Sequence, residues 1–221
     1  MNITDGDASK RMWGERRAWM VHTQLEARGI HHAGVLAAMG TVPREAFVPR
    51  DVEERAYADM PLPIGWAATI SQPYVVAHMS ELAAVEPGDR VLEVGTGSGY
   101  QAAVLRELGA EVYSIESVPA LADRARLRLE ALGYDGIHVR AGDGTLGWPE
   151  AAPFAAIVVT AAPTEIPPAL RDQLADGGRM VIPVGPLHIQ ELLVVTRRGD
   201  ALQTRAIEAV AFVPMRPPMA S

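Results

Sequence analysis

The sequence predicts an α/β fold with a doubly wound, Rossmann-like sheet, mostly parallel with an antiparallel C-terminal strand. Three observations predict it. A short apolar run, residues 91–94, meets three alternating glycines and continues as a helical pattern. Beyond this turn, strand-like and helical segments alternate, which is typical of a parallel sheet. The last two strand-like segments are joined by residues 197–200, a hairpin-like connection that makes them antiparallel neighbours.

Length and composition limit the possible classes. The chain has 221 residues, of which 48% are hydrophobic, so a packed core is expected. A net charge of −7 does not supply the basic face that nucleic acid requires. The absence of cysteine excludes disulfides, thiolate metal sites and cysteine nucleophiles. No apolar run approaches the ~20 residues that span a bilayer, and residues 1–17 lack the apolar stretch of a signal peptide. We therefore expect a cytoplasmic protein with no membrane partner.

The first 50 residues predict short helices. Residues 1–14 are polar and expected to be frayed, residues 15–28 have the apolar spacing of an amphipathic helix stopped by Gly29, and residues 31–39 predict a second helix. Residues 42–49 are bounded by prolines and cannot be regular helix throughout. The histidines in this region have no carboxylate at metal-ligand spacing, so no metal site is expected.

Residues 57–74, which we call the lid, are too apolar for a solvated loop and too interrupted by proline for one element. We expect an irregular, functional segment. Its polar residues Thr69, Ser71 and Gln72 either contact a substrate or cap the helix that begins near Pro73. Both interpretations remain open from the sequence.

The glycines Gly95, Gly97 and Gly99 predict a tight turn whose bare main chain and helix N-terminus suit a ligand with negative charge. The dinucleotide fingerprint needs its third glycine where this chain has Tyr100, so a nicotinamide oxidoreductase is disfavoured. A second strand-like run ends at Glu116. Counted from Gly95, this position is close to the ~20 residues expected before an acidic residue that binds ribose hydroxyls. Such a turn with an acidic partner is the pattern of S-adenosylmethionine-dependent methyltransferases; the alternative is a purely structural turn.

The remaining segments complete the alternation. We expect helices at residues 119–132 and 167–174 and strands at 137–141, 154–159, 179–184, 191–196 and 204–213. Asp143, between two glycines after a strand, is either a turn residue or an acceptor for an exocyclic amine such as that of adenine. Because Gly95, Glu116 and Asp143 all follow strands, one pocket at the carboxyl edge of the sheet can collect them.

Several stretches together resemble the protein-L-isoaspartate (D-aspartate) O-methyltransferase family. They are residues 20–21, 24–25, 28–30, 42–44, 47–49, 61–65, 69–73, the glycine turn, 142–144 and 174–185. Other methyltransferases share the glycine turn but not the Thr-Ile-Ser-Gln-Pro segment, which makes the lid the specific signal. The resemblance implies one domain, with N-terminal helices and lid in residues 1–79 and a cofactor-binding core in residues 80–221.

The resemblance implies methyl transfer from S-adenosyl-L-methionine, with S-adenosyl-L-homocysteine as product, to the free α-carboxylate of L-isoaspartyl residues in damaged proteins. Repair then begins through a succinimide. It also implies that Ser71 is catalytic, that Glu116 holds the ribose and that Asp143 with Gly144 frames the adenine. The full expected cofactor set is Thr69, Ile70, Ser71, Glu93, Gly95, Gly97, Gly99, Glu116, Ser117, Asp143 and Gly144. The expected substrate set is Ile64, Ala68, Val184 and Gly185.

The chemistry needs no general base, because a peptide carboxylate with a pKa of ~3.5 is already ionised at neutral pH. Hydroxyls and backbone amides suffice to orient it. We therefore expect Ser71, with main-chain groups of Thr69 and Ile70, to hold the carboxylate while Ile64, Ile70 and Val184 exclude water.

Two departures from the family pattern concern substrate geometry. Residues 66–68 lack the glutamine that many relatives carry, and Ala155 stands where an acidic residue is common. An alternative function is therefore a carboxyl methyltransferase of the same fold acting on an aspartate of a dedicated peptide. A non-catalytic sensor that only binds the cofactor is a third hypothesis. The expected partners are isoaspartyl peptides and proteins, with no nucleic acid, and the chain is expected to be a monomer.

Overall fold

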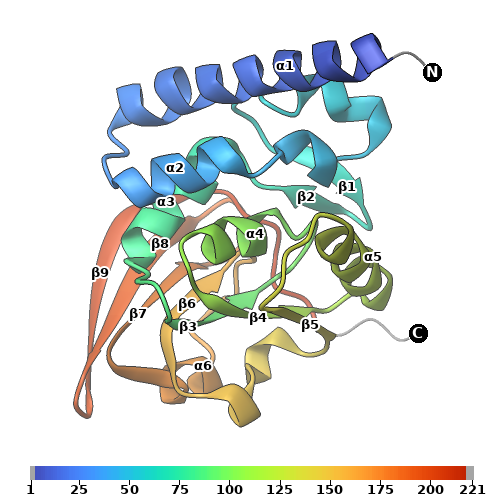
Figure 1. Cartoon of the computed structure of the whole chain (residues 1–221). Coiled ribbons are helices and arrows are strands. Elements are labelled where there is room, and N and C mark those ends of the chain that lie inside the picture. Colours follow the sequence, from blue (N-terminus) through green and yellow to red (C-terminus); the bar gives the residue numbers. More distant parts are fainter. Residues whose placement is uncertain (1–2, 218–221) are drawn as a thin grey trace.

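The structure is a computed structural model that describes residues 3–217, with side chains from residue 8. A seven-stranded sheet forms its centre, in the order β5-β4-β3-β6-β7-β8-β9 (Figure 1). These strands are β3 (Arg90–Val94), β4 (Glu111–Glu116), β5 (Ile137–Ala141), β6 (Phe154–Val159), β7 (Leu174–Val184), β8 (Gln190–Arg198) and β9 (Ala201–Val210). Strands β3 to β7 pair in parallel, whereas β8 is antiparallel to both neighbours. The predicted fold class is confirmed.

Strand β3 lies inside the sheet, between β4 and β6, and is covered on both faces. Its alternate side chains enter different cores: Val91 joins the larger apolar cluster and Leu92 the smaller one. Both side chains are fully buried. This two-sided burial explains why parallel strands have continuous apolar sequences.

Helices cover the two faces unequally. The helices are α1 (Ile3–Met20), α2 (Ala33–Thr41), α3 (Pro73–Ala83), α4 (Tyr100–Glu107), α5 (Pro119–Ala131) and α6 (Pro168–Asp172). Residues of α2, α3, α4 and α5 build the larger cluster, and α6 contributes to the smaller one. The layer of α1 and α2 therefore lies on the α3 and α4 side of the sheet (Figure 1).

The prediction that residues 1–14 are frayed is wrong for the described residues, because α1 begins at Ile3. Tertiary contacts favour the helix over the weak local pattern. Trp13 packs on Tyr57 with ring centroids 6.2 Å apart, and Arg16 forms an ion pair with Glu54 at 2.8 Å. After Met20 the chain continues as one π-helical segment (Val21–Leu25) and one 3-10 segment (Glu26–Arg28), and it stops at Gly29 as predicted, with φ +94°.

The proline-interrupted sequence predicts an irregular lid, and this prediction is wrong in part. The lid contains an antiparallel hairpin of β1 (Leu62–Gly65) and β2 (Ala68–Ile70). Its two-residue loop, Trp66 and Ala67, has φ values of +52° and +54°. Such positive values fit the primed turns that match the strand twist, but these turns usually carry Asn or Gly. The hairpin was therefore missed from the sequence, because its loop has neither Asn nor Gly.

Smaller differences concern element ends. Helix α2 includes Gly40, and α6 is shorter than the predicted residues 167–174. Strand β7 begins at Leu174, ahead of the predicted strand at residues 179–184, and its register against β6 shifts. Short 3-10 segments occur at Arg44–Phe47, Arg50–Arg55, Gly144–Leu146 and Pro149–Ala151.

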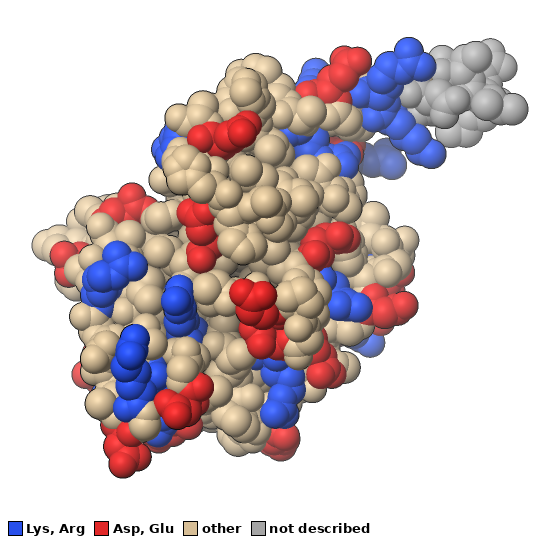
Figure 2. Space-filling view, turned by 60° about the vertical axis from the view of Figure 1, so that its left-hand side comes forward, with Lys and Arg blue, Asp and Glu red and all other residues tan. Residues whose placement is uncertain are grey.

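No helix in residues 3–217 is long and apolar enough to cross a membrane. On the face seen in Figure 2, basic and acidic side chains lie interspersed among uncharged ones.

Candidate active site

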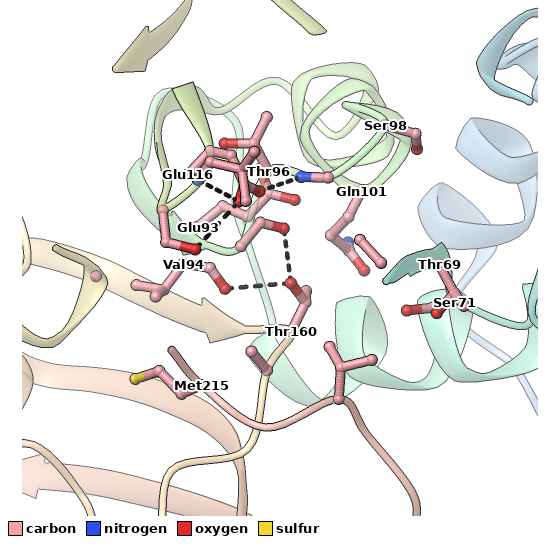
Figure 3. A pocket seen from close by; sticks show the side chains of 18 of the residues that line it. Thr69, Ser71, Glu93, Val94, Thr96, Ser98, Gln101, Glu116, Thr160 and Met215 are labelled. Carbon is pink, nitrogen blue, oxygen red and sulfur yellow. Dashed lines mark hydrogen bonds between the residues drawn. The ribbon is translucent and has the colours of Figure 1, made fainter. Parts of the chain in front are cut away.

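One cavity brings together the lid, the glycine turn and the carboxyl ends of neighbouring strands. Its wall consists of residues 66–71, 76, 93–98, 100–101, 115–118, 144, 160–161 and 213–216. Figure 3 shows Thr69 and Ser71 on one side and Glu93, Thr96 and Glu116 on the other, with Gln101 between them. Segments far apart in the sequence therefore share one site, as the switch-point rule for parallel sheets predicts.

The three glycines of the turn have positive φ values, as a sharp strand-to-helix turn requires: +103° at Gly95, +54° at Gly97 and +90° at Gly99. A Cβ at Gly95 would overlap Thr160 Oγ1, which donates to Gly95 O at 2.7 Å and to Val94 O at 3.1 Å (Figure 3). A Cβ at Gly99 would instead meet the Leu129 side chain at 3.3 Å. Gly95 thus permits close approach of the strand ends, and Gly99 permits α4 to pack on α5.

The carboxylate of Glu116 fixes the turn from the next strand. Its Oε2 accepts a hydrogen bond from Gly97 N at 2.8 Å, and its Oε1 accepts one from Val118 N at 3.0 Å. Glu116 lines the cavity beside Ser117. An ionised carboxylate has about four acceptor positions, so hydroxyl donors of a ligand can still bind there.

Glu93 is a fully buried carboxyl at the bottom of the site. Ser114 Oγ donates to its Oε2, while its Oε1 has no hydrogen-bond partner within residues 8–217. Burial raises the pKa of Glu93 to about 8. A cationic group bound beside Oε1 would satisfy this atom and favour the ionised carboxylate.

Strand β2 places Thr69 and Ile70 along the cavity wall, and Ser71 follows directly after the strand. The capping interpretation of the lid is wrong, because the residue that precedes α3 is Gln72 and its side chain makes no capping hydrogen bond. Gln72 Nε2 donates instead to Asp59 Oδ2 at 2.7 Å. The hydroxyls of Thr69 and Ser71 are therefore left for another role.

Asp143 makes the hydrogen bonds of a turn residue, since its Oδ1 accepts from Thr145 N at 2.9 Å and from Thr145 Oγ1 at 2.7 Å, and its part in adenine binding stays a prediction. The cavity wall at this strand end is Gly144, where a Cβ would overlap the Val94 side chain. Other expected residues also lie outside the wall of this cavity: Ile64 is buried next to Gly97, and Val184 packs at the edge of the smaller cluster. Gly185 lines a neighbouring cavity, whereas Ala68 lies in the main wall.

Several wall residues were missed by sequence reasoning. Thr160 follows β6 directly, so the rule that collected the other strand ends would have found it. Residues 213–216 carry no local signal; they reach the site because Ala162 N donates to Val213 O at 2.9 Å and Met215 N donates to Ala162 O at 2.8 Å. No cluster of three or more metal-ligating side chains occurs in the described part of the chain.

Comparison with known proteins agrees with this geometry. The family model of protein-L-isoaspartate(D-aspartate) O-methyltransferases matches residues 16–218. A protein-L-isoaspartate O-methyltransferase from Methylorubrum populi is 58% identical over 200 residues, which are 90% of this chain and 94% of that protein. One from Gloeobacter violaceus is 55% identical over 197 residues, which are 89% and 96% of the two chains.

Solved structures share the fold. A protein-L-isoaspartate O-methyltransferase superposes with a TM-score of 0.82 at 27% identity, over 91% of this chain and 65% of that longer one. A Plasmodium falciparum structure in complex with S-adenosyl-L-homocysteine superposes with a TM-score of 0.78 at 24% identity, over 90% and 98% of the two chains.

Proposed function

We propose that this chain, which belongs to the protein-L-isoaspartate(D-aspartate) O-methyltransferase family, methylates the free α-carboxylate of L-isoaspartyl residues in damaged proteins. The methyl ester then closes to a succinimide, which begins repair. One observation carries the proposal: the family-specific segment with Thr69 and Ser71 lines the same cavity as the glycine turn.

The site fits S-adenosyl-L-methionine. Glu93 Oε1, buried without a partner in residues 8–217, suits the ammonium group of its methionine part. Glu116 and Ser117 suit the ribose, and Gly95 and Gly97 contribute to the cavity wall beside them. The proposed cofactor set is completed by Thr69, Ile70, Ser71, Gly144 and, at the same strand end as Gly144, Asp143. Gly99 supports the turn from behind through its packing on Leu129.

Bound S-adenosyl-L-methionine supplies an electrophilic methyl group. The chain's own task is to orient an ionised carboxylate and keep water away from it. Ser71 and the main chain of Thr69 and Ile70 supply hydrogen-bonding groups on the lid side, and Ile70 is buried. No residue has to remove a proton, because the carboxylate is ionised at neutral pH. Pre-set orientation and exclusion of water are therefore the catalytic contributions of this site. Ala68, Ile64, Val184 and Gly185 are proposed to face the substrate strand.

The test is transfer of a labelled methyl group from S-adenosyl-L-methionine to a synthetic isoaspartyl peptide, beside the same peptide with normal aspartate. Transfer to the isoaspartyl peptide alone is expected. Binding of S-adenosyl-L-homocysteine without transfer to either peptide would overturn the repair function and favour a dedicated peptide substrate or a sensor.

We also propose that the protein acts as a monomer in the cytoplasm, on isoaspartyl segments of proteins rather than on nucleic acid or membranes. The net charge of −7 supports the proposal that the substrate is not nucleic acid, because negative charge opposes binding to phosphate backbones. Light scattering after size-exclusion chromatography tests the oligomeric state, and a dimer mass would contradict the proposal.

A further inference from the structure

Arg44 is a buried cation that contacts the lid at Ser71, directly after β2. It lies in the 3-10 segment Arg44–Phe47 and is inaccessible to solvent. Its Nε donates to Ala56 O at 2.7 Å, and its Nη2 donates to Ser71 O at 2.7 Å. The guanidinium therefore ties the proposed catalytic residue to Ala56, the residue that precedes the lid.

The charge of Arg44 has no direct anionic partner among residues 8–217. Its Nη1 has no hydrogen-bond partner in this part of the chain. The acids nearby are engaged elsewhere: Glu45 pairs with Arg17 at 3.4 Å, and Asp59 pairs with Arg28. Asp59 acts on Arg44 only through its electrostatic field. A buried cation in this state is unfavourable unless an anion joins it.

The position of Arg44 places this charge behind the cavity wall at two points. One is Ser71, through the hydrogen bond to its carbonyl. The other is Tyr100, whose ring centre lies 4.8 Å from the guanidinium carbon and which itself lines the cavity. The guanidinium is thus separated from the cavity by one aromatic ring or one peptide group, and in a water-poor interior a charge acts far more strongly than in solvent. An anion that enters between Ser71 and Tyr100 gains this attraction.

We propose that Arg44 is a positioning residue whose charge attracts the substrate α-carboxylate, while its hydrogen bond holds the backbone of Ser71. This inference rests on the proposed function, since it takes the isoaspartyl carboxylate as the anion. Methylation neutralises that carboxylate, so the attraction holds the substrate and is lost in the ester product. The charge therefore acts on KM more than on kcat, because it stabilises the bound anion before methyl transfer.

The experiment compares two peptides that differ at one group: an isoaspartyl peptide and its α-carboxamide analogue, which is neutral there. Their dissociation constants are measured by calorimetry in the presence of S-adenosyl-L-homocysteine, for the wild type, Arg44→Gln and Arg44→Lys. Arg90→Gln is the matched control, because Arg90 also donates to a backbone carbonyl, Ala151 O at 3.0 Å, but lies at the opposite end of β3 from the glycine turn.

We expect the wild type, Arg90→Gln and Arg44→Lys to bind the carboxylate peptide at least tenfold more tightly than the carboxamide. Arg44→Gln should lose this preference, keep its affinity for the carboxamide and for S-adenosyl-L-homocysteine, and raise KM more than it lowers kcat. If Arg44 had a purely structural role, Arg44→Gln would weaken the binding of both peptides equally.

A folded Arg44→Gln that keeps the tenfold preference would overturn the inference. If this variant does not fold, Arg44→Lys decides: loss of the preference with intact binding of S-adenosyl-L-homocysteine would overturn it, as would a wild type without preference. Failure of the proposed function is distinct, since it appears as absence of methyl transfer by the wild type.

Discussion

Replacement of Gly95 by Ala should damage the site through two separable effects. The backbone at Gly95 has φ +103°, and a side chain there costs about 1–3 kcal/mol of backbone strain. The new Cβ would also overlap Thr160 Oγ1, so that hydroxyl must move and give up its hydrogen bonds to Gly95 O and Val94 O. Because one hydroxyl proton is shared between these two carbonyls, they count as one lost hydrogen bond of about 1 kcal/mol, and with the strain we expect a total loss of about 2–4 kcal/mol in the free energy of unfolding.

Urea unfolding measures this loss, and calorimetry measures the affinity for S-adenosyl-L-homocysteine, which should fall at least tenfold because the turn shifts. Gly88→Ala is the control for strain alone, since φ at Gly88 is +90° and a Cβ there meets nothing within 4 Å. Thr160→Ala removes the overlapping hydroxyl. In that background Gly95→Ala should lose only the strain energy, so the two changes should couple by about 1 kcal/mol.

Two results would refute this reasoning. One is a Gly95→Ala variant no less stable than Gly88→Ala, with unchanged ligand affinity. The other is strict additivity of Gly95→Ala and Thr160→Ala, which would show that the hydroxyl and the new Cβ do not interfere.

Three further changes test other parts of the site. Ser71→Ala should lower kcat at least tenfold and leave the affinity for S-adenosyl-L-homocysteine within threefold, because the hydroxyl is proposed to orient the carboxylate; collapse of ligand binding alone would contradict its role. The pKa of Glu93 is about 8 in the fold against 4.5 ordinarily, so the unfolded chain releases this proton first. Stability of the ligand-free protein should therefore fall as pH rises between these values, by up to ~1.4 kcal/mol per unit. Denaturant unfolding from pH 5 to 8 should find this contribution missing in Glu93→Gln, and an unchanged slope would count against a buried, protonated Glu93. Ala67→Gly should raise the free energy of unfolding by about 0.5–1 kcal/mol, because Ala67 has φ +54°; a lower melting temperature would argue that the loop strain is absent.

The sequence determined the fold class because the relevant signals are local. The apolar run at β3, the glycines after it and the acidic residue that ends β4 all lie within 30 positions of one another in the chain. Parallel strands bring their carboxyl ends to one edge, so these residues had to meet once the alternation was recognised. Gly95, Gly97 and Glu116 accordingly lie at one site.

The N-terminal half resisted prediction where local preference and tertiary contact disagree. The first turns of α1 have weak amphipathic spacing, and the helix contacts the lid further along, where Trp13 packs on Tyr57. The β1–β2 hairpin uses Trp66 and Ala67 at positive φ, which no turn propensity favours. Asp143 shows the reverse case, since its local role as a turn residue is the one its hydrogen bonds display.

Chain topology and pattern alone thus determined the sheet and the glycine turn, and they identified the segment with Thr69 and Ser71 as a candidate site. Only the tertiary structure decided what lies around them: Thr160 against Gly95, residues 213–216 in the cavity wall, and Arg44 behind Ser71. Arg44 and Ser71 are 27 positions apart in the chain, and Thr160 and Gly95 are 65 positions apart, so packing of the whole core brings them into contact. A periodicity of two or 3.6 residues carries no information at that range, because it reports which face of an element is buried and not what lies against it.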